Sequence, residues 1–304
     1  MRLAPPHART RRHATALETV TVTVPDHAVE HYEAALLSVC GTVGLFLDEA
    51  TGLWQLEGVK DQGEAEPELA AGLALAGLLT GVEAVPERRE TPAEGWLART
   101  YQSFPEQCVG RRFAVRGTHL SGPGAPGRLV LTLDAGIAFG SGEHGSTRGC
   151  LGALERVAYR KPLRILDMGT GSGILAMAAA ALLHRRVLGT DIEPWSVRVA
   201  AENAALNGLG RRARFVLANG WTAPAVRAAG PFDLVFANIL ARPLCRMAAS
   251  LARHLAPGGT AILAGLLDSQ VRLVLAAHRR HGLRLESRQH EGRWATLVLR
   301  KPCA

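Results

Sequence analysis

Hydrophobic positions in the first part of the chain change between the period of a strand and the period of a helix. Residues 19–24 (TVTVTV) alternate strictly between threonine and valine, which predicts a half-buried strand. Apolar spacing then predicts a helix, two strands, a second helix and a further strand, over residues 26–39, 43–47, 53–56, 69–79 and 82–85. The order βαββαβ is that of a small α+β, ferredoxin-like domain. We expect this domain over residues 1–90, with residues 1–15 as a flexible start.

The second part of the chain, residues 131–304, alternates short apolar runs with helical patterns. The predicted strands are residues 163–166, 187–190, 215–217, 232–237 and 261–264, followed by a closing antiparallel pair, 283–285 and 294–299. Strands separated by helices favour an α/β domain with a parallel sheet and right-handed crossovers. Residues 91–130, which include the turn-rich run SGPGAPG, are expected to form a linker with one or two short ordered pieces between the two domains, and residues 129–133 are expected to form a strand after it.

A glycine-rich turn, DMGTGSG at residues 167–173, lies between the first of these strands and an alanine-rich helix. The next strand ends on Asp191, 22 residues after Gly169, where a carboxylate accepts hydrogen bonds from a nucleoside ribose. The dinucleotide pattern GxGxxG requires a glycine at position 174, which is Ile174 here. GxGxG preceded by Asp167 instead resembles the first motif of the S-adenosylmethionine (SAM) dependent methyltransferases. The other alternative is an ordinary glycine-rich turn of an α/β enzyme.

Composition is that of a folded protein without metal or membrane features. Hydrophobic residues make up 47% and charged residues 20% of the chain, and no apolar run approaches the roughly 18 residues that a membrane span requires. The five cysteines are scattered and form no CxxC pair. We therefore expect a cytoplasmic protein without a metal site, a disulfide framework or membrane contact.

Charge is divided unevenly along the chain. Residues 1–94 hold seven Lys and Arg against fifteen Asp and Glu, a net charge of −8, whereas residues 95–304 hold 28 against 12, a net charge of +16. The two parts are therefore expected to meet different partners. An acidic N-terminal domain suits a basic protein target. The arginines of the second part either contact RNA or reflect the base composition of the genome.

These motifs resemble those of a known family. The glycine-rich turn, Asp191, the loop LDAGIAFGSGEHGST at residues 133–147 and the ANIL of residues 237–240 are similar to those of the bacterial ribosomal protein L11 methyltransferases, the PrmA family. The resemblance implies a seven-stranded Rossmann-like SAM methyltransferase domain over residues 131–304. It further implies a SAM-dependent protein-lysine N-methyltransferase that modifies lysine side chains, the N-terminal amine or both in L11. That substrate is either free or on the large subunit, and direct RNA contact is not required.

The resemblance also indicates site residues. Carried over position by position, the SAM contacts of the family fall on Thr147, Gly169, Asp191 and Asn238. Gly171, in the same glycine-rich turn, is predicted to bind the cofactor as well.

The chain departs from the family pattern just before Thr147. Gly145-Ser146 replace a Pro-Thr pair, and Ser141 replaces a threonine. The loss of a proline leaves this loop less rigid, which bears on affinity but not on the chemistry. We expect the loop, residues 134–147, to close over the cofactor.

Methyl transfer from a sulfonium is an in-line displacement, so the protein chiefly has to align a neutral amine with the S–CH₃ bond. Asn238, at the C-terminal end of the fourth predicted strand, is the predicted catalytic residue because an amide oxygen accepts from an amine N–H without bearing charge. Two alternatives stay open. One is a lysine methyltransferase for another protein, such as the electron-transfer flavoprotein β subunit, and the other is a non-catalytic ribosome- or RNA-binding protein.

Overall fold

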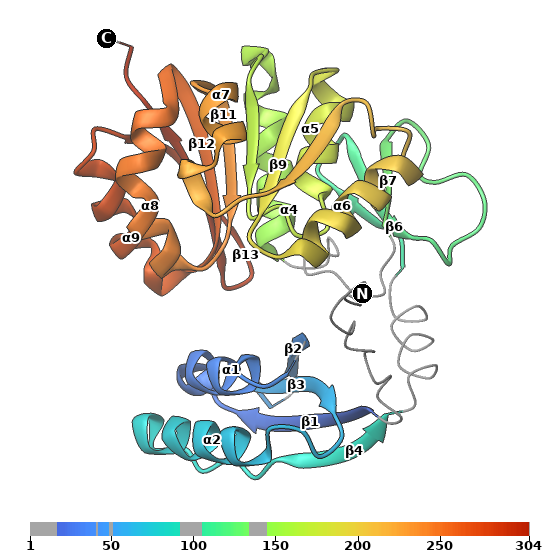
Figure 1. Ribbon diagram of the computed structural model, residues 1–304, viewed down its shortest axis with the longest axis vertical. Helices are drawn as coiled ribbons and strands as arrows, with labels where there is room; N and C mark the ends of the chain where they lie inside the picture. Colours follow the sequence, from blue (N-terminus) through green and yellow to red (C-terminus); the bar gives the residue numbers. More distant parts are fainter. Residues whose placement is uncertain (1–16, 41, 49–50, 92–104, 134–144, 304) are drawn as a thin grey trace, which may run out of the picture. The chain divides into compact units, whose positions relative to one another are not determined.

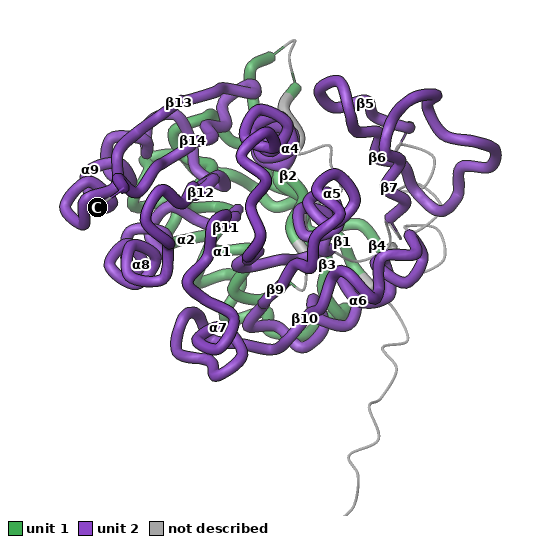
Figure 2. Tube along the Cα trace, turned by 90° about the horizontal axis from the view of Figure 1, so that it is seen from above, with its two compact units in different colours: residues 1–99 green, residues 100–304 purple. Residues whose placement is uncertain are grey.

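The computed structural model describes residues 17–40, 42–48, 51–91, 105–133 and 145–303. It divides into two compact units, residues 1–99 (unit 1) and residues 100–304 (unit 2), shown in green and purple in Figure 2. The start expected to be flexible, residues 1–15, and the loop segment 134–144 lie outside the described residues. No described helix is long and apolar enough to cross a membrane.

Unit 1 is a four-stranded antiparallel sheet with two α-helices packed on one face (Figure 1). Its elements are β1 (Leu17–Val24), the 3-10 helix η1 (Asp26–Ala28), α1 (Val29–Leu37), β2 (Thr42–Asp48), β3 (Leu53–Asp61), α2 (Glu66–Thr80) and β4 (Glu87–Thr91). The strands lie in the order β2-β3-β1-β4. The strand predicted from strict alternation is confirmed: Val20, Val22 and Val24 are fully buried against the helices, and Thr23 on the other face is exposed.

The last strand of unit 1 differs from the prediction. The apolar run 82–85 predicts a strand, but β4 lies at the polar residues Glu87–Thr91. The hydroxyl of Tyr32 donates to the carbonyl of Val82 and accepts from the N–H of Ala84. The buried tyrosine therefore satisfies backbone groups that a strand would pair with the sheet, and the chain joins the sheet only afterwards.

Unit 2 is built on a seven-stranded sheet. Its strands are β8 (Ile165–Met168), β9 (Val187–Asp191), β10 (Ala213–Leu217), β11 (Phe232–Asn238), β12 (Leu255–Leu267), β13 (Arg284–Glu291) and β14 (Trp294–Arg300). They lie in the order β10-β9-β8-β11-β12-β14-β13. The first five are parallel to one another, while β14 is antiparallel to both β12 and β13. The predicted closing pair is thus confirmed, with β13 at the edge.

Helices cover both faces of this sheet (Figure 1). One face carries α4 (Gly145–Val157), α5 (Ile174–Leu183) and α6 (Pro194–Leu206), and the other carries α7 (Pro224–Ala229), α8 (Ala241–His254) and α9 (Val271–Arg279). Short 3-10 helices are η2 (Ala158–Arg160), η3 (Gly220–Thr222) and η4 (Asp268–Gln270). The sequence of α5, ILAMAAAALL, is apolar on all sides because most of the helix is buried.

A second, three-stranded sheet occupies part of the segment expected to be a linker. It consists of β5 (Gln107–Val109), β6 (Phe113–Gly117) and β7 (Leu129–Leu133), in the order β5-β6-β7, and β7 packs on α5. Arg116 of β6 is buried and donates to the carbonyls of Leu120, Ser121 and Gly122. The glycine- and proline-rich run that suggested a linker is therefore an anchored turn within unit 2.

Candidate functional site

The candidate site lies at the carboxyl ends of the parallel strands, next to β8. The chain runs from β8 to β9 and β10 on one side and then places β11 on the other side of β8. Open α/β sheets bind their ligands outside the strand ends at such a change of direction. Ala237 of β11 pairs with Met168 of β8, so Asn238 and the glycine-rich turn begin at the same level of the sheet.

The glycine-rich turn has a backbone that side chains would not allow. Gly169, Gly171 and Gly173 have φ angles of +71°, +52° and +83°, in the left-handed region. A Cβ atom on Gly169 would lie 2.4 Å from Cγ2 of Ile239. The N–H groups of Gly169 and Thr170 donate to the carbonyl of Thr190. The turn thus holds its backbone close to β9 and β11, which leaves room for a ligand to approach the main chain.

Asp167 anchors this turn from below. Its Oδ2 accepts hydrogen bonds from the hydroxyl of Thr170 (2.7 Å) and from the N–H of Ala176 (3.1 Å) in the first turn of α5. The side chain is fully buried, and this burial raises the pKa of the carboxyl to about 6. Thr170 was not singled out from the sequence, although a hydroxyl three residues after a buried acid is a detectable signal.

Asp191 ends β9 beside the same turn. Its Oδ2 accepts from the N–H of Gly171 (3.0 Å), and its Oδ1 accepts from the N–H of Glu193 (3.1 Å). An ionised carboxylate has about four acceptor positions, so two of them suffice to fix Asp191 and others remain for ligand hydroxyls. The structure therefore brings together Gly169, Gly171 and Asp191, three of the residues predicted to bind the cofactor.

The other two predicted residues meet across the sheet end. Asn238, the last residue of β11, donates from Nδ2 to Oγ1 of Thr147 in the first turn of α4, at 3.4 Å. Oδ1 of Asn238 is buried and has no hydrogen-bond partner among the described residues. A buried acceptor without a partner is costly and calls for a donor that is absent from the described chain. The glycine-rich turn and this acceptor together fit a ligand with N–H or hydroxyl groups.

The Gly145-Ser146 departure has a packing role. A Cβ atom on Gly145 would lie 2.7 Å from the carbonyl oxygen of Glu291 and 3.0 Å from Cδ1 of Trp294. The start of α4 thus packs against the β13–β14 turn so closely that a proline would not fit without a shift. Ser146 is buried as well. This contact, rather than a proline ring, positions the helix that carries Thr147.

Three exposed apolar side chains at the strand ends were not predicted. They are Ile192 after β9, Leu217 at the end of β10 and Leu240 after β11, with 64%, 58% and 59% of their surface exposed. Each stands where a parallel strand leaves the core, which is visible in the sequence once the strands are assigned. They offer apolar contact area beside the polar groups of the site.

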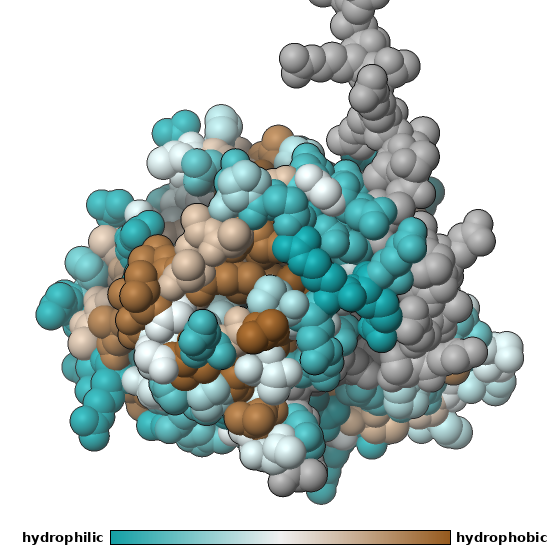
Figure 3. All heavy atoms as spheres, turned by 90° about the horizontal axis from the view of Figure 1, so that it is seen from below, coloured by the Kyte–Doolittle hydropathy of each residue, from teal (hydrophilic) through white to brown (hydrophobic). Residues whose placement is uncertain are grey.

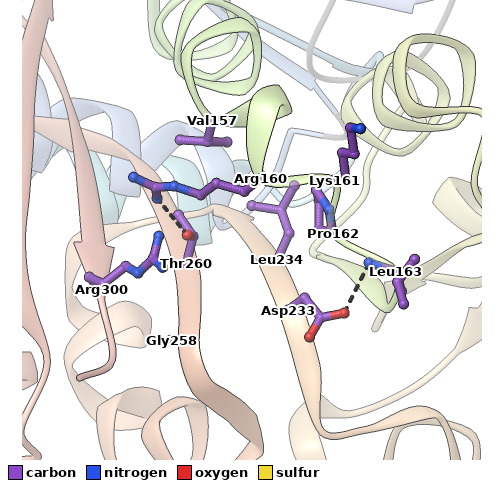
Figure 4. Close-up of a pocket in the computed structure, with 10 residues that line it drawn as sticks. All are labelled: Val157, Arg160, Lys161, Pro162, Leu163, Asp233, Leu234, Gly258, Thr260 and Arg300. Atoms are coloured by element: carbon purple, nitrogen blue, oxygen red, sulfur yellow. Dashed lines mark hydrogen bonds between the residues drawn. The ribbon is translucent and has the colours of Figure 1, made fainter. Parts of the chain in front are cut away.

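A cavity of about 270 Å³ lies elsewhere, at the amino ends of β8 and β11. Figure 4 shows that Arg160 reaches the hydroxyl of Thr260, and that the carboxylate of Asp233 faces the N–H of Leu163, at 2.8 and 2.9 Å. These groups are engaged in holding the ends of the strands, and the cavity is at the opposite edge of the sheet. We therefore do not assign the candidate site to it. Among the described residues, no three His, Cys, Asp or Glu side chains are grouped to hold a metal ion.

Comparison with known proteins points to one family. The model of the family described as ribosomal protein L11 methyltransferase (PrmA) matches residues 81–302. A protein of that name from Bradyrhizobium diazoefficiens is 49% identical over 211 residues, which are 69% of this chain and 71% of the relative. One from Caulobacter sp. is 42% identical over 259 residues, which are 84% of this chain and 86% of the relative.

A solved structure agrees with the sequence relatives. The ribosomal protein L11 methylase from Lactobacillus delbrueckii subsp. bulgaricus is 33% identical and superposes with a TM-score of 0.59, covering 65% of this chain and 98% of that one. The extent of these matches, and the match of the family model over most of unit 2, show the family. This chain belongs to the ribosomal protein L11 methyltransferase (PrmA) family.

Proposed function

We propose that this chain transfers methyl groups from SAM to lysine side chains, the N-terminal amine or both in ribosomal protein L11. Family membership supports SAM as the methyl donor and L11 as the substrate. The observation that carries the proposal is the buried, unpartnered Oδ1 of Asn238, at the strand end beside the glycine-rich turn. An acceptor in that place suits the N–H group of an amine or of the cofactor.

The cofactor supplies a methyl group on a positively charged sulfur. The residues of this chain bind the cofactor and orient the amine that receives the methyl group. Gly169 and Gly171 allow the main chain to approach the ligand. Asp191 accepts hydrogen bonds from the ribose hydroxyls, as carboxylates at the end of the second strand do. Thr147 fixes the amide nitrogen of Asn238, so that the amide oxygen is the atom left to accept.

The choice of an amide at position 238 suits the protonation state that the reaction needs. A free lysine has a pKa of about 10.4, and only its neutral form has a lone pair to attack the methyl group. A carboxylate at this position would favour the ammonium form and raise that pKa further. The amide of Asn238 accepts an N–H hydrogen bond without this penalty, and we assign it as the catalytic residue.

We infer that unit 2 is a seven-stranded, Rossmann-like SAM methyltransferase domain, to which β5 and β6 from the expected linker also belong, and that unit 1 is a ferredoxin-like substrate-recognition domain. The strand order β2-β3-β1-β4 supports the ferredoxin-like description. The net charge of −8 over residues 1–94 supports recognition of a basic protein. The substrate is either free or on the large subunit in the cytoplasm, and RNA contact is not required.

Mass spectrometry tests the proposal directly. Purified full-length protein is incubated with SAM and L11, and the intact mass and peptide masses of L11 are followed over time. We expect 14 Da steps on lysines or on the N-terminal amine. They should form about 100-fold more slowly with Asn238→Ala. Electron-transfer flavoprotein β subunit serves as the competing substrate, and methylation of that protein but not of L11 would reassign the enzyme to another substrate.

A further inference from the structure

Helix α2 of unit 1 has two apolar faces, of which the fold buries one. The buried face consists of Leu69, Leu73 and Ala76. The opposite face, which we call the outer stripe, is spaced i, i+3, i+4, i+7 along the helix and consists of Ala71, Ala74, Leu75 and Leu78. All of its members are exposed. A helix that is apolar on every side is normally covered on every side, so the outer stripe calls for a partner.

The outer stripe is a continuous patch rather than a set of scattered side chains. Leu75 and Leu78 expose 57% and 84% of their surface, and the adjacent Leu79 exposes 62%. No charged residue occurs from position 69 to position 82. Figure 3 shows apolar side chains gathered over the part of unit 1 where α2 lies, beside a hydrophilic area. Patches of this kind on soluble domains mark sites of protein contact.

Carboxylates border the stripe and set the charge of its partner. Glu68, one turn before Ala71, and Glu83, just beyond the end of α2, are both exposed. Residues 17–91 hold three Lys and Arg against fourteen Asp and Glu, a net charge of −11. Of the three bases, Lys60 and Arg88 form ion pairs with Glu18 and Glu66 inside the unit. An apolar stripe on so acidic a unit is complementary to an apolar ridge flanked by lysines or arginines.

We propose that the outer stripe of α2 is the surface on which unit 1 docks its protein substrate, through an apolar ridge flanked by basic residues. The inference rests on the proposed function, because that function gives the chain a protein substrate as its partner. The distribution of apolar side chains also indicates which face of unit 1 contacts the substrate. The open face of the sheet exposes polar side chains such as Thr23 and Gln55, whereas the apolar area lies on α2.

The test is a set of paired substitutions in the full-length protein, with methylation of L11 measured against L11 concentration. L75Q/L78Q should raise the KM for L11 about tenfold or more, because it places two polar amides in the desolvated centre of the proposed interface, where most of the binding energy resides. It should leave kcat, SAM affinity and Tm unchanged, because both side chains are exposed and remote in sequence from the SAM site. L206Q/L273Q is the matched control: these leucines on helices of unit 2 are 53% and 55% exposed, and KM should not change. Thr23→Lys on the open sheet face should not change KM either.

The outcomes separate this inference from the proposed function. If the wild-type protein does not methylate L11, the proposed function fails and the docking inference fails with it. If the wild-type protein methylates L11 and L75Q/L78Q has the same KM, the docking inference alone is overturned. An increased KM for Thr23→Lys without one for L75Q/L78Q would overturn it in favour of the sheet face. Light scattering tests whether a second copy of the chain covers the outer stripe. A wild-type dimer that L75Q/L78Q converts to a monomer would overturn the docking inference in favour of that second copy.

Discussion

The side-chain amide of Asn238 donates to the hydroxyl of Thr147 across 3.4 Å, and these two residues are 91 positions apart in the chain. The bond joins the end of β11 to the first turn of α4. Thr147 is fully buried, so its hydroxyl holds a fixed position. Because the amide nitrogen is engaged, the amide oxygen of Asn238 is the group presented to a ligand.

Removal of this oxygen should affect turnover more than cofactor binding. We expect Asn238→Ala to lower kcat by about 100-fold, the order of loss that misalignment of a reacting group causes. SAM affinity, measured by calorimetry, should change much less, since the glycine-rich turn and Asp191 remain. A variant that loses SAM affinity in proportion to kcat would place Asn238 in the cofactor pocket and leave alignment of the amine to other groups.

Thr147 is expected to act through Asn238. In Thr147→Val the shape is kept but the amide loses its acceptor, so kcat should fall by about tenfold, in line with one hydrogen bond. Thr147→Ser retains a hydroxyl and should restore most of the rate. Single-turnover rates of the two variants at saturating SAM provide the comparison. Equal rates for the valine and serine variants would contradict a positioning role.

Asp191 should determine SAM affinity. Asp191→Ala removes the acceptor for the ribose and also the bond to the N–H of Gly171, and we expect a loss of roughly 1.5–3 kcal/mol of binding free energy. Asp191→Asn keeps one oxygen that can accept from the N–H of Gly171 but carries no charge. Comparison of the two variants therefore separates the loss of the hydrogen bond to the turn from the loss of the negative charge. Calorimetry with SAM and with its demethylated product gives both values. A folded Asp191→Ala variant with wild-type affinity would move the ribose site elsewhere.

Asp167 should impose a pH dependence on stability. Burial raises the pKa of its carboxyl to about 6 in the folded protein, above the ordinary value of 3.8. The folded state therefore retains this proton to a higher pH than the unfolded chain does. Its contribution to stability is complete below about pH 4 and is lost as the pH rises through about 6.

The matched variant for this effect is Asp167→Asn, which does not titrate and keeps an oxygen for Thr170 and Ala176. The free energy of unfolding of the wild type, minus that of this variant, should fall by on the order of 3 kcal/mol between about pH 4 and pH 7. Urea unfolding at several pH values measures it. A difference that stays constant, or that rises with pH, would contradict the raised pKa.

Lys60 should stabilise unit 1 without affecting the SAM site. Its ammonium lies 2.6 Å from Glu18 and 2.7 Å from Glu66, and the side chains of Lys60 and Glu18 are only 2% and 8% exposed. Lys60→Met leaves the Glu18 carboxylate buried without this partner, which costs about 3–5 kcal/mol in buried ion pairs. Hydrogen exchange in unit 1 should then increase while SAM affinity stays constant. The pair Glu18→Gln with Lys60→Met should recover most of the protection.

Local chemistry in the sequence was sufficient to predict much of the geometry of the candidate site. The run 167–173 could be recognised because left-handed backbone needs glycine, and Asp191 because it ends the strand that follows the next helix, 22 residues after Gly169. The alternation in β1 was equally readable, since burial on one face imposes a period of two. Strand β14 was readable as a short apolar run, because it is buried on both faces.

The tertiary structure decided what depends on contacts between distant segments. The pairing of Thr147 with Asn238 follows from α4 packing over the end of β11, and no spacing in the sequence records it. Strand β4 lies at Glu87–Thr91 and not at the apolar run 82–85, because the buried hydroxyl of Tyr32 forms hydrogen bonds with the backbone of that run. The packing of β7 on α5 likewise makes part of the expected linker an ordered part of unit 2. The partners of Tyr32 lie 50 and 52 positions along the chain and that of Asn238 lies 91 positions away, and hydrogen bonds of that kind form only once the fold has brought the partners together.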